Sequence, residues 1–310
     1  MKRKQKKFVA WCPTHIYQKG YQGRVLFYCL RDRLVYLSIF FEEARKRGVE
    51  VLAIALMFNH VHATVRARDR AALAGFNQAV QHRYAAARNR ASGRKGPVFM
   101  RTYGWAQKRS DKDVCENLCY IANNSQKKRL FRRAVDDRWT LLAYGREDYP
   151  FSQPIALARA RRPMRRAVAL VRACREMGTG LTYQLLDKLF AELTPGESRQ
   201  LADLIVQEYS EVNFEEAASY FGGFGKMLAA FEVTSGSEYE ISEEFTPEPD
   251  VPYREMVKVV KAAGFDLVGK AFLGREELSR LFRRRTSASE RQIVRFLHLR
   301  PENHTGRAGG

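Results

Sequence analysis

LMFNHVHATVR, residues 56–66, is the stretch that decides the fold of this chain. After a short turn, its side chains alternate as in a strand with one apolar and one polar face. Because successive side chains of a strand point to opposite faces, His60 and His62 share a face with Thr64 and Arg66. Two imidazoles at this spacing can hold a metal ion when a third ligand arrives from elsewhere.

The segments around this stretch predict the order β-α-β-β-α-β. Alternating or β-branched runs predict strands, and apolar residues at helical spacing predict helices; the strands are at 8–17, 49–56, 60–66 and 98–105, and the helices at 31–47 and 70–90. A further helix is expected at 111–133, capped by Ser110. The order contains the split β-α-β unit of a ferredoxin-like sandwich. We therefore predict an α+β fold, with helices packed on one face of an antiparallel sheet and a mostly α-helical C-terminal region.

Composition divides the chain into five parts. Residues 1–150 hold the predicted sheet, 151–233 a helical domain, 234–251 an exposed acidic linker, 252–300 three short helices and 301–310 a disordered tail. The last two helices have the outline of a helix-turn-helix DNA reader, with Arg291 and Arg295 on the exposed side of the second. The alternative is a solvated helical pair that only docks on a core.

The charge of the chain points to a polyanionic partner. The formal net charge is +20 and the pI is about 10.0, which fits nucleic acid. No run of 18 apolar residues predicts a membrane span, and the basic N-terminus lacks the apolar core of a signal peptide. The five scattered cysteines are typical of reduced thiols in a cytoplasmic protein, and Cys115 and Cys119 lack the second ligand pair of a zinc site.

The helix predicted after Ser110 carries a polar stripe beside its apolar one. The stripe has helical spacing and consists of Asp113, Asn117, Tyr120, Asn124 and Lys127. Tyr120 therefore has a carboxamide about one turn away on either side. On the pattern alone, a surface tyrosine with a hydrogen-bonded hydroxyl is the simpler interpretation.

Together these features suggest phosphodiester chemistry. Two neutral imidazoles and an oxygen ligand can hold Mg²⁺ or Mn²⁺ with open positions, and the ion polarises the phosphodiester. A tyrosine with an unperturbed pKa of about 10 becomes a nucleophile near such an ion and forms a phosphotyrosine. The energy of the cleaved phosphodiester bond is kept in the phosphotyrosine, so the same site can reverse the step and join the DNA to a different strand.

Two motifs resemble those of the single-tyrosine transposases. Residues 57–62, MFNHVH, resemble the HUH motif (histidine, bulky apolar residue, histidine), and Tyr120–Asn124 resembles the nucleophile helix. The REP-associated tyrosine transposases of bacterial chromosomes are the most similar in style, and the resemblance covers roughly residues 8–145. Two positions depart from that pattern, because relatives commonly have proline where Phe58 and Ser125 stand.

The resemblance implies a site and a substrate. His60, His62 and Asn124 would be the metal ligands, with Asn123 and Gln126 as alternatives for the third, and Tyr120 would be the nucleophile. The substrate would be single-stranded DNA with hairpins or palindromic repeats, cleaved through a 5′-phosphotyrosine. For contacts to DNA we expect Asn59, Arg66, Lys127, Lys128, Arg291 and Arg295, and for base stacking Trp11, Tyr17, Tyr21, Tyr103 and Trp105.

Three other functions fit parts of the pattern. A replication initiator or relaxase would use the same chemistry at one site, a DNA-binding regulator would keep the fold without catalysis, and a metal hydrolase would need carboxylates that the site lacks. We expect a cytoplasmic, nucleoid-associated bacterial protein that binds single-stranded or hairpin DNA, with a homodimer as its candidate assembly and no membrane partner.

Overall fold

The computed structural model of the chain describes residues 7–232, 249–264 and 274–299. Four antiparallel strands form one sheet in the order β2-β3-β1-β4; they are β1 (Thr14–Lys19), β2 (Glu50–Leu56), β3 (His60–Arg66) and β4 (Gly104–Gln107). Helix α1 (Leu30–Lys46) connects β1 to β2, and α2 (Arg70–Ser92) connects β3 to β4. The predicted α+β class and antiparallel sheet are confirmed. Within the described ranges, no helix is both long and apolar enough to cross a bilayer.

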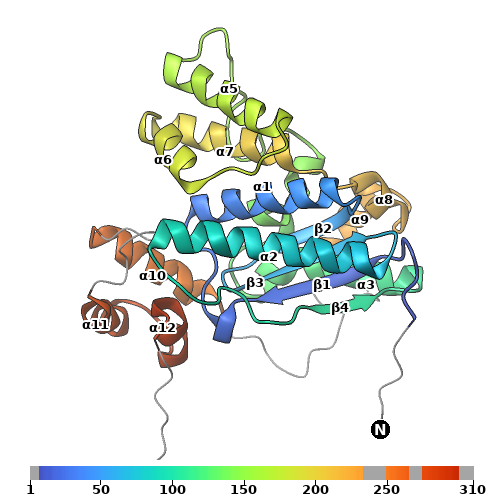
Figure 1. Ribbon diagram of the computed structural model, residues 1–310, viewed down its shortest axis with the longest axis horizontal. Helices are drawn as coiled ribbons and strands as arrows, with labels where there is room; N and C mark the ends of the chain where they lie inside the picture. Colours follow the sequence, from blue (N-terminus) through green and yellow to red (C-terminus); the bar gives the residue numbers. More distant parts are fainter. Residues whose placement is uncertain (1–6, 233–248, 265–273, 300–310) are drawn as a thin grey trace, which may run out of the picture.

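Helices cover both faces of the sheet. Helices α1 and α2 lie side by side across one face (Figure 1), where Val61, Ala63 and Val65 of β3 are buried in the main core. Helix α3 (Asp111–Ala122) lies against β2 and β3 on the other face, and the Thr64 hydroxyl donates to Oδ1 of Asn117 at 2.7 Å. The prediction that helices pack on one face therefore needs correction, since α3 covers part of the second face and leaves it open over β1, β4 and the start of β3.

Three elements have boundaries that differ from the predicted ones, and the first two are strands. Strand β1 begins at Thr14 rather than at residue 8, because Trp11 has a φ of 57° and Pro13 has no N–H to give to a neighbouring strand. Strand β4 begins at Gly104 rather than at residue 98 and ends at Gln107 rather than at 105, because Phe99 makes only an isolated bridge to Gly20.

The helix predicted at 111–133 is also shorter. It ends at Ala122 and is followed by the single turn α4 (Asn124–Lys127), and Arg129 then takes a left-handed φ of 57° that no helix continues through.

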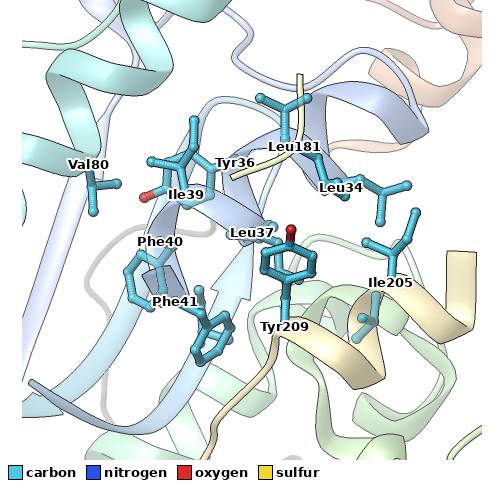
Figure 2. Packing of buried hydrophobic residues seen from close by; sticks show 14 of the residues in the cluster. Leu34, Tyr36, Leu37, Ile39, Phe40, Phe41, Val80, Leu181, Ile205 and Tyr209 are labelled. Atoms are coloured by element: carbon cyan, nitrogen blue, oxygen red, sulfur yellow. The ribbon is translucent and has the colours of Figure 1, made fainter. Parts of the chain in front are cut away.

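A helical layer covers the far side of α1. It consists of α5 (Arg162–Glu176), α6 (Tyr183–Ala191) and α7 (Pro195–Tyr209), which stack above α1 in Figure 1. Figure 2 shows Leu37 of α1 beside Tyr209 of α7, within one core that reaches from the sheet into this layer. Two short helices, α8 (Phe214–Ser219) and α9 (Phe224–Glu232), pack against α3 and the β2 end of the sheet.

The last three helices dock on the first half of the chain through a second core. Helices α10 (Val251–Ala262), α11 (Arg275–Arg285) and α12 (Glu290–Leu297) pack against Val25, Tyr28 and the pair Met57-Phe58. The predicted helix pair is present and docked, while DNA reading by it stays a prediction. Most of the acidic linker predicted at 234–251, and the tail predicted at 301–310, lie outside the described residues.

A buried carboxylate ties the start of α1 to its neighbours. Asp32 is fully buried and accepts hydrogen bonds from the backbone N–H of Tyr28, the guanidinium of Arg88 on α2 and the hydroxyl of Tyr183 on α6. The same carboxylate closes the capping box of α1. Because a buried charge is tolerated only when it is paired and hydrogen-bonded, these bonds fix how α1, α2 and α6 meet.

Phe58 joins the turn before β3 to the C-terminal helices. Its side chain is 7% exposed, and its ring centroid lies 5.6 Å from that of Tyr253 on α10. The guanidinium of Arg33 lies 5.1 Å from the Phe58 ring centroid on α1's side of the same contact. A proline here would lack this aromatic contact, which gives the departure at this position a packing reason.

We expect Phe58→Ala to lower the free energy of unfolding by about 3 kcal/mol, since it empties part of the second core. The loss should appear first as faster hydrogen exchange in α10–α12, measured by mass spectrometry, with α1 and the sheet still protected. Met177→Ala, at a side chain that is 67% exposed, is the control and should shift stability by less than about 0.5 kcal/mol. Equal exchange in α10–α12 of Phe58→Ala and of the unmodified protein would contradict this assignment.

Candidate active site

The open part of the second sheet face is a cleft of about 900 Å³. Its floor comes from β1, β3 and β4, and its walls come from α3, α4 and the C-terminal helices. Five cationic side chains line it and Asp250 is the only acidic one among the described lining residues; the cations are Lys19, Lys108, Lys127, Lys128 and Arg295. The cleft therefore suits an anionic ligand.

The two predicted histidines stand together in this cleft. The ring centroids of His60 and His62 are 4.9 Å apart, with the rings nearly perpendicular. Nδ1 of His60 lies 2.7 Å from Oδ1 of Asn59, whose Nδ2 donates to the carbonyl of Gly23 at 3.2 Å. Because this second bond orients the amide, Oδ1 must accept from His60, and Nε2 of His60 keeps its lone pair.

His15 of β1 contacts Nδ1 of His62, as Asn59 contacts Nδ1 of His60. Its Nε2 lies 3.0 Å from Nδ1 of His62, so one hydrogen is shared between the two rings. With His62 as the donor, Nε2 of His62 also keeps its lone pair. Partners on Nδ1 that orient the ring are typical of metal-binding histidines.

Burial keeps the three imidazoles neutral. It lowers the pKa of His60 to about 3, with smaller effects of Lys128 and Lys19. Burial lowers the pKa of His62 well below its usual value, and His60 and His15 add to this. The pKa of His15 falls to about 4 for the same first reason. At neutral pH these rings can therefore act as ligands or hydrogen-bond partners but carry no charge.

Helix α3 brings Tyr120 to the histidines. The Tyr120 ring stands edge-on to His62, with 5.3 Å between centroids, and Nζ of Lys127 lies 5.3 Å from the Tyr120 ring centroid. One turn later, Nδ2 of Asn124 donates to the carbonyl of Tyr120 at 2.8 Å. This bond leaves Oδ1 of Asn124 as the acceptor that the side chain offers to the cleft.

These residues fit a divalent metal ion by the chemistry of their donors. Among the described residues, no group of three or more His, Cys, Asp or Glu side chains is placed to hold a metal ion. The predicted set is different, with two neutral imidazoles and one carboxamide oxygen, and His60, His62 and Asn124 all line the same cleft. Nitrogen and oxygen ligands in this number leave open positions for a substrate oxygen.

The other predicted residues divide between the cleft and its surroundings. Lys127, Lys128 and Arg295 line the cleft, while Arg291 is exposed on α12 outside it. The guanidinium of Arg66 lies outside as well, where it pairs with Glu216 and Glu50 and donates to the carbonyl of Trp11; Asn123 and Gln126 are likewise not among the lining residues. Asn59 lines the cleft, but its amide is used on His60 and Gly23.

Two predicted stacking aromatics lie in the cleft, Tyr17 and Trp105. Tyr17 is 39% exposed and its ring covers Gly104 of β4. A Cβ at Gly104 would lie 1.9 Å from Cε1 of Tyr17, so only glycine lets the ring lie on the strand in this way.

Two of the cleft residues that had no predicted role lie next to the predicted site residues. The first is His15, which reaches His62 through the pairing of β1 with β3. The second is Asn117, which is 1% exposed and lines the cleft one turn before Tyr120. Its Oδ1 accepts from Thr64, and its Nδ2 meets no acceptor among the described residues. Its place on the polar stripe of α3 was the available signal.

Comparison with known proteins adds one remote similarity. No protein-family model matches the chain, and no curated protein matches its sequence. Among solved structures, the chain is similar to a REP-associated tyrosine transposase bound to a REP hairpin, with a TM-score of 0.36 and 12% identity over 45% of this chain and 81% of that one. A similarity of this size leaves fold and function to be argued from the chain's own residues.

Proposed function

We propose that this chain is a metal-dependent endonuclease and strand transferase that acts on single-stranded DNA through a 5′-phosphotyrosine. The observation that carries the proposal is the position of Tyr120 against two neutral histidines, His60 and His62, in one cationic cleft. A nucleophile, candidate metal ligands and cations for phosphates thus meet at one place. Their origin in β3 and α3 agrees with the HUH motif and nucleophile helix that the sequence resembles.

The topology of the sheet also supports the proposal. The order β1-α1-β2-β3-α2-β4 and the sheet order β2-β3-β1-β4 are those of a split β-α-β sandwich of the ferredoxin-like kind. We assign the sheet and its three helices to an HUH domain on this basis, with α4 completing the wall of the cleft.

The reaction would proceed by direct displacement at phosphorus. The hydroxyl of Tyr120 loses its proton as Oη forms a bond to the phosphorus. The bond between the phosphorus and the 3′ oxygen breaks, and the 3′ oxygen takes up a proton and leaves as a hydroxyl. His60, His62 and Asn124 would hold Mg²⁺ or Mn²⁺, which when bound polarises the phosphodiester. The strand transfer step is the reverse attack, in which a 3′-hydroxyl displaces Tyr120 from the phosphorus.

The remaining cleft residues would bind and orient the strand. Lys127 and Lys128 follow Tyr120 by two turns of helix and bring positive charge to the phosphates on either side of the cleavage point. Asn117 lies about one turn before Tyr120, and its buried Nδ2 would donate to a phosphate oxygen once a strand fills the cleft. Hairpins or palindromic repeats are the proposed substrates.

Incubation of the protein with labelled single-stranded hairpin DNA and Mg²⁺ tests the proposal. We expect a covalent protein–DNA adduct that survives denaturing electrophoresis and is lost in Tyr120→Phe or with EDTA. Tyr17→Phe, which changes a second tyrosine of the same cleft, should keep the adduct. His60→Ala should lose it, and His82→Ala, at an exposed position of α2, should not.

An adduct that persists in Tyr120→Phe would contradict the assigned nucleophile. If no hairpin or repeat oligonucleotide forms an adduct while DNA still binds, the chain is a binding protein without catalysis.

We expect Asn117→Ala to lower the rate of adduct formation roughly 10- to 100-fold, as loss of one donor to a developing oxyanion does. DNA affinity, measured by fluorescence anisotropy, should change little because one neutral donor is lost. Asn123→Ala is the matched control, since Asn123 caps the same helix but does not line the cleft. Equal rates for the two variants would show that Asn117 serves only the packing of α3 on β3.

A further inference from the structure

A second, smaller pocket lies behind the loop that borders the cleft. We call it the arginine pocket; its volume is about 50 Å³, and it is lined by Arg24, Val25, Arg88, Asn89, Ser92, Arg94, Lys95, Pro97, Val98 and His298. Three segments build it, namely the loop before α1, the end of α2 with the residues after it, and the C-cap of α12. Its volume is several times the ~10–15 Å³ that one water needs, so a tetrahedral anion has room.

The arginine pocket is positively charged. Among its described lining residues four are cationic and none is acidic. Arg88 is paired with the buried Asp32, and Arg24, Arg94 and Lys95 bring three further positive charges to the pocket. Burial and the nearby cations Arg275, Arg88 and Arg24 lower the pKa of Arg94 to about 10. The pKa falls first because burial disfavours the charged guanidinium, and the neighbouring cations add to this effect.

The donors in the pocket are held in place. Nη1 of Arg94 lies 2.7 Å from Nδ1 of His298, whose Nε2 lies 2.9 Å from the Tyr28 hydroxyl. Arg24 packs its guanidinium over the Tyr21 ring at 5.3 Å from the centroid, and its Nε is buried and meets no acceptor among the described residues. A side chain that is already held in one orientation loses little conformational entropy when it binds an anion.

The arginine pocket and the cleft share their dividing wall. Gly23 lines the cleft, and the next residue, Arg24, lines the pocket. On α12, Arg295 lines the cleft and His298, about one turn later, lines the pocket. A strand that leaves the cleft over this loop would therefore bring its next phosphates to the pocket.

We propose that the arginine pocket binds one backbone phosphate of the DNA strand that occupies the cleft. This inference rests on the proposed function for the identity of the ligand. It assigns the C-cap of α12 a role in DNA binding, since His298 positions Arg94. The contact carries no sequence information but fixes the register of the strand relative to Tyr120.

Fluorescence anisotropy with the full chain, labelled single-stranded hairpin DNA and EDTA, which prevents cleavage, tests the pocket. We expect Arg94→Gln to weaken binding three- to tenfold at 100 mM NaCl and to reduce the slope of log K against log salt concentration by about 0.7. Lys95→Gln, at an exposed side chain that does not affect folding, should shift both quantities in the same direction. Arg159→Gln is the control, because it removes the same charge at an exposed position that lines neither pocket.

The phosphate itself is tested by replacing single linkages with neutral methylphosphonates. At one position of the strand, the methylphosphonate should weaken binding to the unmodified protein but leave the DNA affinity of Arg94→Gln unchanged. The proposal is overturned if Arg94→Gln and Lys95→Gln both bind as Arg159→Gln does. A second result would also overturn it. Inorganic phosphate would stabilise the unmodified protein against heat but not Arg94→Gln, while both proteins would bind DNA with equal affinity.

The two proposals fail in different ways. DNA binding that depends on Arg94 without a Tyr120 adduct would refute the cleavage reaction and keep the pocket. An adduct that forms with binding independent of Arg94 would refute the pocket alone.

Discussion

The register between β3 and its neighbour β1 is the constraint on which the site depends. Tyr17 pairs with His62 and Lys19 with His60, so these four side chains share one face of the sheet. Because side chains alternate, a shift of β3 by one residue would bury both histidines against α1 and α2 and turn Val61 into the cleft. Val61, Ala63 and Val65 lock the register by their burial in the main core. The same residues that stabilise the sheet therefore present the histidines.

A polar contact helps to fix the position of Tyr120, the proposed nucleophile. The hydrogen bond from Thr64 to Asn117 joins the polar face of β3 to the polar stripe of α3, and Tyr120 follows one turn later on that stripe. The apolar side of α3 packs on β2 and on α9, which prevents the helix from rotating about its axis. The C-terminal helices complete the cleft from the other side, and Phe58 couples them to the turn that carries His60.

The arrangement of the site residues within each strand and helix could be predicted from the sequence, because it depends on local side-chain patterns. Strand alternation placed His60 and His62 together, and helical spacing placed Tyr120 and Asn124 on one stripe. The ends of β1, β4 and α3 could not be predicted as well, because they depend on single left-handed or unpaired residues such as Trp11 and Arg129. Those φ angles are set by tertiary packing rather than by composition.

Contacts between distant segments were beyond the sequence patterns. His15 orients His62 only because β1 pairs with β3, and Arg66 pairs with Glu216, a residue of α8 from the second half of the chain. The role of Phe58 likewise required the position of Tyr253 on α10. In each case the residue type was ordinary, and its partner lay 47 or more positions away.

We propose that residues of β3, α3 and α4 form one metal-dependent nicking centre. Anomalous diffraction from crystals grown with Mn²⁺ tests it most directly. We expect a single strong peak in the cleft, coordinated by His60, His62 and Asn124 beside Tyr120. A peak held by other residues, or no peak at a Mn²⁺ concentration that supports DNA cleavage, would contradict it.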